Sequence, residues 1–480
     1  EEESDDDEVV VVRDSKDRTS KMPWKLIRFH GIGKAGNQDS LSLRDIVSVP
    51  GKLNFVVLAT FDADMNWLLQ SWPELKSVKR VVFIHGMESK HHEQFQDACP
   101  AHFEIVCRHP KYVICGKHPR TGGDVTFYRG CHHTKFMMLG FEGGMRFVIH
   151  TAALGCSFNM STQGAYVQDF PIKKSMNSSS GAFENTLIEY CKSYEEVGRR
   201  SSLRDTEPKL WQGLRMKPKS WPGLGTERKM KLSEMVACFD FSSARGHLLA
   251  SVRSRCLECE NSVIMCIDPN NFETQVPGYH RDESRDKWGH LQVRRLLARG
   301  GAVFPPRKFS SSCKDVIVAQ FTSFASLKKQ YRDELKSSFS PGLRSDNNPM
   351  GPTEFEIVWP TWNEVANSIY GESSGGVMPG SLKNAQVALK DGALRTWCSD
   401  RKDLRKSSMV SERRRAMPHI KTFSRASADG KVLDWSILTS CNISQAAWGK
   451  IQKDGAQFCI QSWEMGILFT PSTLRSSSSS

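Results

Sequence analysis

The feature that most constrains this chain is a pair of similar blocks, each with a histidine and a lysine two positions apart. The first block contains His133 and Lys135, and the second contains His419 and Lys421. An apolar stretch, a turn with glycine and a second β-rich run follow in both. Side chains alternate between the faces of a strand, so each histidine and its lysine point the same way. A single such triplet occurs by chance in a chain of this length, and its repetition makes the pattern informative.

Length and local sequence predict an α/β fold. At 480 residues the chain is long enough for more than one domain, or for one large two-lobed unit. We expect buried strands at 54–61, 80–86 and 315–321, and helices at 65–72 and 288–297. Strands that alternate with helices indicate a sheet covered on both faces.

The composition divides the chain into four parts. Residues 1–21 form an acidic leader that we expect to be disordered, and 472–480 a Ser-rich flexible tail. Between them we expect a first lobe over 22–253 and a second lobe over 254–471, each with one His-x-Lys block. No apolar run approaches the roughly 20 residues of a membrane-spanning helix, so we expect no membrane association.

The balance of charge favours a polyanionic partner. The formal net charge is +13, although seven of the 53 acidic residues lie within the first eight positions. The rest of the chain therefore has 46 acidic against 66 basic residues. A body this basic suits nucleic acid most simply, with a membrane surface or solubility alone as the alternatives.

The cysteines indicate a reducing compartment and no metal site. Fourteen cysteines are spread along the chain without the spacing of a disulfide framework. Cys256 and Cys259 form the only Cys-x-x-Cys pair, and a structural zinc site would need a second pair or two nearby histidines. We therefore expect no metal and no cofactor.

Two imidazoles can divide the cleavage of a phosphodiester between them. One attacks phosphorus and forms a phosphohistidine, while the other protonates the leaving oxygen and then activates water. The ammonium groups of Lys135 and Lys421 would stabilise the charge on the phosphate oxygens in the transition state. Asn442 can donate to a phosphate oxygen, and a carboxylate such as Glu464 can hold a histidine in one tautomer. Metal-assisted hydrolysis would need clustered carboxylates, which neither block contains.

Further motifs accompany the two blocks between about residue 45 and residue 471. They are His132-His133-Thr134-Lys135, Thr162-Gln163-Gly164, Lys287-Trp288-Gly289-His290, Ala416-Met417-Pro418-His419-Ile420-Lys421-Thr422, Ala446-Ala447-Trp448-Gly449 and Ser462-Trp463-Glu464-Met465-Gly466. With these motifs the sequence resembles the tyrosyl-DNA phosphodiesterase 1 family of the phospholipase-D superfamily. The resemblance implies an α/β fold of two similar phospholipase-D-like lobes, each a mixed β-sheet flanked by helices, with the active site in the cleft between them.

The resemblance also implies a role for individual residues. His133 would be the nucleophile, and His419 the general acid and then the general base. The other implicated residues would contact the phosphate (Lys135, Lys421 and Asn442), position the histidines (Glu464 and Gln163) or contact the DNA strand (Ser326, Ser381 and Ser444). Without the resemblance, a salt bridge at a strand end is the better interpretation of Glu464, and Gln163 and the three serines are ordinary loop residues.

The sequence departs from the family pattern at three positions of the expected site. The family has His-Thr-x-Asn-Leu where this chain has His150-Thr151-Ala152-Ala153-Leu154, so Ala153 replaces a phosphate-binding asparagine. Loss of such a hydrogen bond would lower the rate roughly 10²-fold or more. A natural paralogue and an engineered variant are both consistent with Ala153. Phe61 stands where we expect a tyrosine, and Arg129 where we expect a phenylalanine, which exchanges stacking on a base for charge.

Three functions remain open on the sequence. The first is a metal-independent phosphodiesterase that removes tyrosyl-peptide and other adducts from the 3′ ends of single- or double-stranded DNA, in nuclear DNA repair. The second is a catalytically weakened end-binding paralogue, and the third a general nuclease or phospholipase of the wider superfamily. RNA ends stay possible, because nothing in the sequence visibly reads a 2′-hydroxyl. We expect a monomer.

Overall fold

The structure is a computed structural model that describes most of the chain. The described residues are 24–87, 94–107, 113–117, 124–127, 130–175, 181–196, 214–216, 228–253, 282–298, 303–304, 314–323, 325, 327–344, 349–397, 412–455 and 457–474. The predicted leader at 1–21, the last six residues of the predicted serine tail and the Cys256–Cys259 pair lie outside these ranges.

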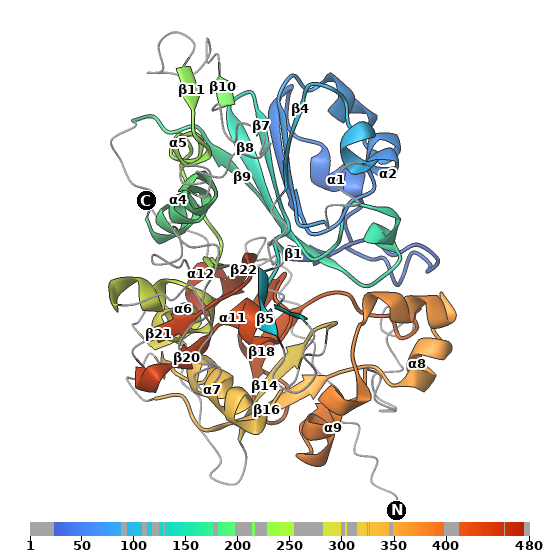
Figure 1. The fold of residues 1–480 in the computed structure, drawn as a ribbon, viewed down its shortest axis with the longest axis vertical. Coiled ribbons are helices and arrows are strands. Elements are labelled where there is room, and N and C mark those ends of the chain that lie inside the picture. Colours follow the sequence, from blue (N-terminus) through green and yellow to red (C-terminus); the bar gives the residue numbers. More distant parts are fainter. Residues whose placement is uncertain are drawn as a thin grey trace, which may run out of the picture.

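Two seven-stranded β-sheets form the centre of the molecule (Figure 1). The first sheet has the spatial order β1 (Trp24–Leu26), β9 (Gly164–Pro171), β8 (Gly144–His150), β7 (Phe136–Phe141), β2 (Leu53–Thr60), β3 (Val81–His85) and β4 (Phe103–Cys107). The second has the order β12 (His247–Ser251), β22 (Glu464–Phe469), β19 (Leu433–Thr439), β18 (Thr422–Ala426), β14 (Asp315–Gln320), β16 (Thr353–Val358) and β17 (Leu394–Arg395).

The two sheets share one pattern of strand pairing. In the first, β2, β3 and β4 run parallel, and β2, β7, β8, β9 and β1 pair antiparallel in turn. In the second, β14, β16 and β17 run parallel, and β14, β18, β19, β22 and β12 pair antiparallel in turn. The predicted fold of two similar α/β lobes with mixed sheets is therefore confirmed. Strand β12 belongs to the second sheet, although it precedes the boundary that we expected between residues 253 and 254.

Helices cover the sheets, as the alternating pattern predicted. They are α1 (Leu43–Val47), α2 (Met65–Ser71), α4 (Ala182–Glu196), α5 (Leu232–Val236), α6 (Gly289–Ala298), α7 (Lys329–Phe339), α8 (Trp362–Ala366), α9 (Leu382–Lys390), α11 (Gln445–Trp448) and α12 (Pro471–Leu474). Successive residues of β2 enter different cores, because side chains alternate along a strand. Phe55 and Val57 pack in the cluster that contains residues of α4 and α5, and Val56 and Leu58 pack with α1 and α2. Within the described ranges, none of the helices has both the length and the apolar character needed to cross a membrane.

Four two-stranded sheets complete the described structure. They pair β5 (Val113–Lys117) with β6 (Asp124–Phe127), β10 (Leu214–Met216) with β11 (Arg228–Met230), β13 (Val303–Phe304) with β15 (Leu343–Arg344), and β20 (Lys450–Gln452) with β21 (Gln457–Cys459).

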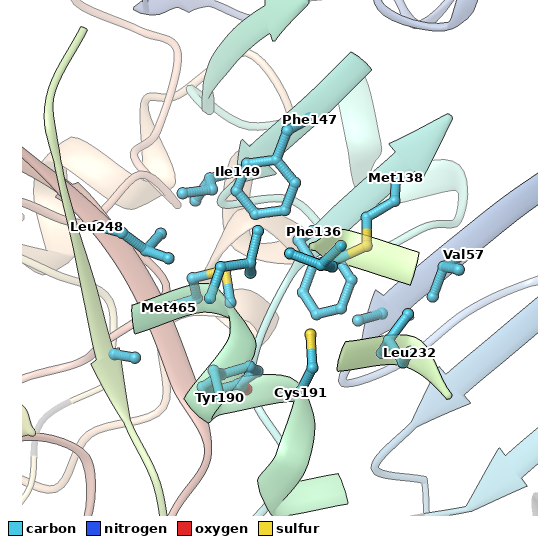
Figure 2. Close-up of a cluster of buried hydrophobic side chains, with 14 of the residues drawn as sticks. Val57, Phe136, Met138, Phe147, Ile149, Tyr190, Cys191, Leu232, Leu248 and Met465 are labelled. Atoms are coloured by element: carbon cyan, nitrogen blue, oxygen red, sulfur yellow. The ribbon is translucent and has the colours of Figure 1, made fainter. Parts of the chain in front are cut away.

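The two lobes share one apolar cluster. Leu248 of β12 and Met465 of β22, both from the second sheet, pack with Phe136, Ile149 and Tyr190 of the first lobe (Figure 2). All five side chains are almost fully buried. Because this packing joins the lobes, it fixes the position of the first His-x-Lys block relative to the second.

Candidate active site

The two His-x-Lys blocks occupy equivalent positions in the two sheets. Lys135 comes directly before β7 and Lys421 directly before β18, and each of these is the central strand of its sheet. In both sheets the strand that follows the block pairs with it from the same relative position. In the first sheet Phe136 lies opposite Ile149. The resemblance between the two blocks in sequence is therefore a resemblance in structure.

Each histidine is hydrogen-bonded by the main chain of the other lobe. The backbone N–H of His133 donates to the carbonyl of Trp463 at 3.0 Å, and that of His419 donates to the carbonyl of Thr162 at 2.9 Å. Both imidazoles are half-buried. These reciprocal contacts bring the two histidines together at the interface between the lobes.

The two lysines are enclosed beneath the histidines. Lys135 is 1% exposed and Lys421 is 0% exposed. Each ammonium donates to the carbonyl of the histidine in its own block, at 2.9 Å for His133 and 2.6 Å for His419. Burial lowers the pKa of Lys135 to about 8 and holds that of Lys421 well below its ordinary value. A phosphate anion between them would raise both pKa values again, because an adjacent negative charge favours the ammonium form.

A side chain from the opposite lobe contacts the inner ring nitrogen of each histidine. Nδ1 of His133 lies 3.1 Å from Oε2 of Glu464, which begins β22. Nδ1 of His419 lies 2.8 Å from Nε2 of Gln163, which directly precedes β9. Since Nδ1 is engaged in both rings, Nε2 is the atom that each histidine would present to a substrate, and at His419 it lies 3.3 Å from Nζ of Lys421.

Two hydroxyl groups hold these two side chains in turn. Thr151 Oγ1 donates to Oε1 of Gln163 at 2.6 Å, and Ser440 Oγ donates to Oε2 of Glu464 at 2.5 Å. Thr151 directly follows β8 and Ser440 directly follows β19, so they too are equivalent. We did not predict either residue. The signal available was the small polar residue that ends the second β-rich run of each block.

The surroundings keep both imidazoles neutral and the carboxylate ionised. Burial and then the Lys135 ammonium lower the pKa of His133, against the opposing effect of Glu464. Burial and then the Lys421 and Lys135 ammonium groups hold the pKa of His419 well below its ordinary value. Burial raises the pKa of Glu464, but His133 and Lys135 outweigh it, and the net pKa lies below the usual range.

Asn442 is oriented as a hydrogen-bond donor toward the site. Its Oδ1 accepts from the backbone N–H groups of Thr322 and Ser323, both at 3.0 Å. With the amide oxygen engaged there, Nδ2 is left to donate to a substrate oxygen. The phosphate-binding role of Asn442 stays a prediction.

Ala153 occupies the equivalent position in the first lobe. It lies three residues beyond the end of β8, as Asn442 lies three residues beyond the end of β19. The backbone around it is fixed beside the loop after β2, because Leu154 donates to the Asp62 carbonyl at 3.3 Å and accepts from the Asp64 N–H at 2.9 Å. A methyl group cannot donate a hydrogen bond, so the first lobe lacks the amide that the second provides.

The described part of the chain contains no group of three or more histidine, cysteine, aspartate or glutamate side chains arranged to hold a metal ion. The two histidines instead have lysines beside them. Two ammonium groups would oppose a bound cation and favour a bound anion. The arrangement therefore suits nucleophilic and acid–base chemistry on a phosphate.

A family model described as "Tyrosyl-DNA phosphodiesterase" matches residues 23–209 and 270–480, which is most of the sequence. The chain belongs to the tyrosyl-DNA phosphodiesterase family. Its predicted membership is confirmed, and both histidine blocks, Gln163, Asn442 and Glu464 lie inside the matched segments.

Named relatives and one solved structure support the assignment to the family. Tyrosyl-DNA phosphodiesterase 1 of Arabidopsis thaliana is 30% identical over 477 residues, which are 98% of this chain and 66% of the relative. Tyrosyl-DNA phosphodiesterase 1 of Drosophila melanogaster is 32% identical over 460 residues, which are 90% of this chain and 63% of the relative. The crystal structure of the yeast enzyme superposes with a TM-score of 0.56 at 16% identity, covering 94% of this chain and 91% of that one, and shares the fold. The chain spans just under two thirds of the length of the two named relatives.

Phe61 is the one predicted DNA-contacting residue that the structure brings to a histidine. Its ring centroid lies 5.5 Å from that of His133, and its side chain is 38% exposed. An exposed aromatic ring at this place can stack on a base next to the reacting phosphate.

Ser381 and Ser444 are the N-cap residues of α9 and α11, where each accepts from a backbone N–H of the first turn. Those bonds stabilise the helix starts and leave each hydroxyl proton to donate, so contact with the DNA strand stays a prediction. Ser326 and Arg129 lie outside the described residues.

Proposed function

We propose that this chain is a phosphodiesterase that cleaves tyrosyl-peptide and other adducts from DNA 3′ ends through a phosphohistidine intermediate, without a metal ion. One observation carries the proposal. Two histidines from different lobes meet, each above a buried lysine and each bonded at Nδ1 by a side chain of the other lobe. The basic composition and the family membership support a nucleic-acid substrate.

The chemistry of Glu464 and Gln163 supports different roles for the two histidines. A carboxylate only accepts hydrogen bonds, so Glu464 keeps a proton on Nδ1 of His133 and leaves a lone pair on Nε2. An amide has a donor and an acceptor, so Gln163 can satisfy His419 whether Nδ1 carries a proton or not. A nucleophile needs one fixed tautomer, whereas a group that acts first as acid and then as base must change its protonation state. We therefore assign the nucleophile to His133 and the acid–base role to His419.

In the first step the lone pair on His133 Nε2 forms a bond to phosphorus. The bond between phosphorus and the tyrosyl oxygen breaks, and its electron pair goes to that oxygen, which takes a proton from Nε2 of His419. Glu464 stabilises the positive charge that remains on the phosphorylated ring of His133. Lys135, Lys421 and Asn442 stabilise the negative charge on the phosphate oxygens.

In the second step a water oxygen attacks phosphorus and gives its proton to Nε2 of His419. The phosphorus–nitrogen bond breaks, and its electron pair returns to Nε2 of His133. The product is a DNA 3′-phosphate. His419, which takes up a proton when the phosphate binds, is protonated again by the water, so both histidines are back in the states from which the first step began.

The substrate follows from the position of the site and from the family. Phe61 lies beside the proposed nucleophile, at the place that the 3′-terminal base next to the reacting phosphate would occupy. Relatives are named for tyrosyl-DNA phosphodiesterase activity, and we infer the same class of substrate for this chain. A nuclear location, a monomeric state and activity on RNA ends are further proposals. A second function, binding of DNA ends with weak catalysis, is favoured by Ala153 alone, because it removes one donor to the phosphate.

Single-turnover cleavage of a 3′-phosphotyrosyl oligonucleotide in excess EDTA tests the proposal. We expect a free 3′-phosphate product, and no cleavage by the His133→Ala variant at comparable times. His419→Ala should instead accumulate a covalent protein–DNA adduct. A strict requirement for added metal would overturn the metal-independent mechanism. Tight end binding without turnover by the wild type would favour the second function.

Preferred cleavage of an internal phosphodiester or of a phospholipid would point to the wider superfamily instead. Both should be tested beside the tyrosyl end, at equal enzyme concentration. His102→Ala provides a matched control, because this exposed histidine lies outside both blocks in the sequence, and its ring contacts the carbonyl of Val78 and the ring of Phe103.

A further inference from the structure

Thr151 and Ser440 form an equivalent pair of buried hydroxyl groups, and both side chains are 0% exposed. Each accepts a backbone N–H from the strand that follows, Thr151 from Gly164 at 3.0 Å and Ser440 from Met465 at 3.1 Å. Each also donates its own proton to the side chain that contacts a histidine of the opposite lobe. The two hydroxyls therefore act on the histidines indirectly, each through one hydrogen bond to the side chain that contacts the histidine.

The partners of the two hydroxyls differ in what they can accept and donate. Ser440 faces a carboxylate, which has no proton, so the hydroxyl must always be the donor. Thr151 faces an amide, which can present either its oxygen or its nitrogen. The hydroxyl of Thr151 has a proton and a lone pair beyond the one that accepts from Gly164, so it can satisfy the amide in both orientations.

We propose, on the basis of the function proposed above, that the Thr151 hydroxyl is a two-way positioning group for Gln163. It donates to the amide oxygen while Nδ1 of His419 has no proton, and it accepts from the amide nitrogen while Nδ1 carries one. Ser440 acts only as a donor, and its hydrogen bond holds Glu464 in position. The hydroxyl of Thr151 thereby allows the amide to follow His419 through its acid and base steps.

The geometry of the site defines the resting orientation. Thr151 donates to Oε1 and the amide nitrogen faces Nδ1 of His419, which is the arrangement of a neutral ring. The charged or titratable groups that act on His419 are Lys421, Lys135 and His133, and all three oppose its protonation. The carbonyl of Thr151 acts in the opposite direction.

A bound phosphate anion would offset the two lysines and bring a proton to His419. The amide then turns its oxygen to the new N–H. When His419 has protonated the leaving group and later released the proton taken from water, the amide can return to the resting orientation.

Thr151→Val tests this role, because valine has nearly the same shape, keeps the carbonyl and removes only the hydroxyl. Each orientation of the amide loses its hydrogen bond to the hydroxyl, because the resting orientation uses the hydroxyl as a donor and the other uses it as an acceptor. Adduct formation, which needs His419 as an acid, and adduct hydrolysis, which needs it as a base, should therefore both slow by roughly tenfold. Thr151→Ser keeps the hydroxyl and should restore both rates.

Ser440→Ala is the matched variant at the equivalent position. It should slow adduct formation, which depends on Glu464 and His133, and change the rate of adduct hydrolysis much less. Both phases are measured in single turnovers of the 3′-phosphotyrosyl oligonucleotide, with the adduct followed by denaturing electrophoresis after an alkaline quench.

The proposal is overturned if Thr151→Val slows only one of the two phases, or if Thr151→Ser is as slow as Thr151→Val in both. Thr151→Ala replaces Thr151→Val in the same comparison if the valine variant does not fold. Failure of the wild type to cleave would instead contradict the proposed function, so the two failures are distinguishable.

Discussion

The two halves of the site have the same backbone geometry and different chemistry. In the first lobe, the bond from Glu464 fixes His133 in one tautomer, and the loop after β8 ends in Ala153. In the second, the amide of Gln163 contacts His419, and the equivalent loop ends in Asn442. A repeated fold thus supplies two positions for a histidine, and a few side chains around each position decide its task.

The residues that flank the two histidines in the sequence also differ. The residues that flank His133 are polar: His132 bonds the hydroxyl of Tyr194 at 2.7 Å, and Thr134 bonds that of Tyr190. The residues that flank His419 are Pro418 and Ile420, of which Ile420 is part of the shared apolar cluster. The proposed nucleophile is therefore held by a directional network, and the proposed acid–base residue by apolar packing and backbone bonds.

The largest expected effect comes from making the two halves alike. Glu464→Gln should permit the unproductive tautomer of His133 and remove the charge that stabilises its phosphorylated form. We expect adduct formation to slow by roughly 10²- to 10⁴-fold, as measured in single turnovers. Hydrolysis of adduct that has formed should slow much less. An equal loss in both phases would contradict the assignment of Glu464 to His133.

Ala153→Asn should act in the opposite direction. The pairing register places Phe61 and Asp62 where Thr322 and Ser323 lie in the second lobe, since Ala59 pairs with Phe136 as Gln320 pairs with Thr422. Their N–H groups can then hold the new amide oxygen.

Adding this donor to the phosphate should raise single-turnover cleavage roughly 10²-fold. Asn442→Ala is the matched variant and should lower it by a similar factor. A gain below about threefold would mean that the wild-type site already functions without the missing amide.

The rate of adduct formation should fall on the acid side of its pH profile only at an unusually low pH. His133 attacks only when Nε2 is unprotonated, and burial with Lys135 lowers its pKa, so the rate should be lost only as pH falls below about 6.5. A substrate with a nitrophenyl leaving group isolates this limb, because that group departs without a proton. Since Glu464 raises the pKa of His133, Glu464→Gln should move the limb lower still. A limb at or above pH 6.5 in the wild type would be inconsistent with the buried, cation-flanked site.

The smallest expected effect concerns the network beneath the first block. Tyr194→Phe removes the hydroxyl that bonds His132 and the hydroxyl of Tyr190, and it should lower the free energy of unfolding by about 1–3 kcal/mol, because two buried hydrogen bonds are lost. Cleavage should change less than tenfold. Denaturant unfolding and single-turnover rates of the same preparation test both parts. A large rate loss with unchanged stability would give the tyrosine a more direct part in the reaction than we assign.

The sequence predicted the fold and the reacting groups because both depend on local pattern. Alternating and continuous apolar runs identified the central strands, and the repeated His-x-Lys spacing identified His133, Lys135, His419 and Lys421. The partners of the histidines depend instead on long-range packing. His133 and Glu464 are 331 positions apart, and no periodicity relates them.

Two features of the molecule depend on contacts that the sequence does not reveal. Strand β12 joins the second sheet although it precedes the expected boundary, because pairing with β22 at the far end of the chain decides its place. Small polar residues mark the positions of Thr151 and Ser440, but their roles depend on which side chain lies opposite each, and the strand registers of the two sheets decide that.

The identity of the histidine that carries the phosphoryl group tests the account most directly. The His419→Asn variant should be reacted with a 3′-phosphotyrosyl oligonucleotide, quenched in alkali, digested and analysed by mass spectrometry. We predict DNA linked through phosphorus to His133 alone. Linkage to any other residue, or turnover without an adduct on His133, would contradict the division of roles between the two lobes.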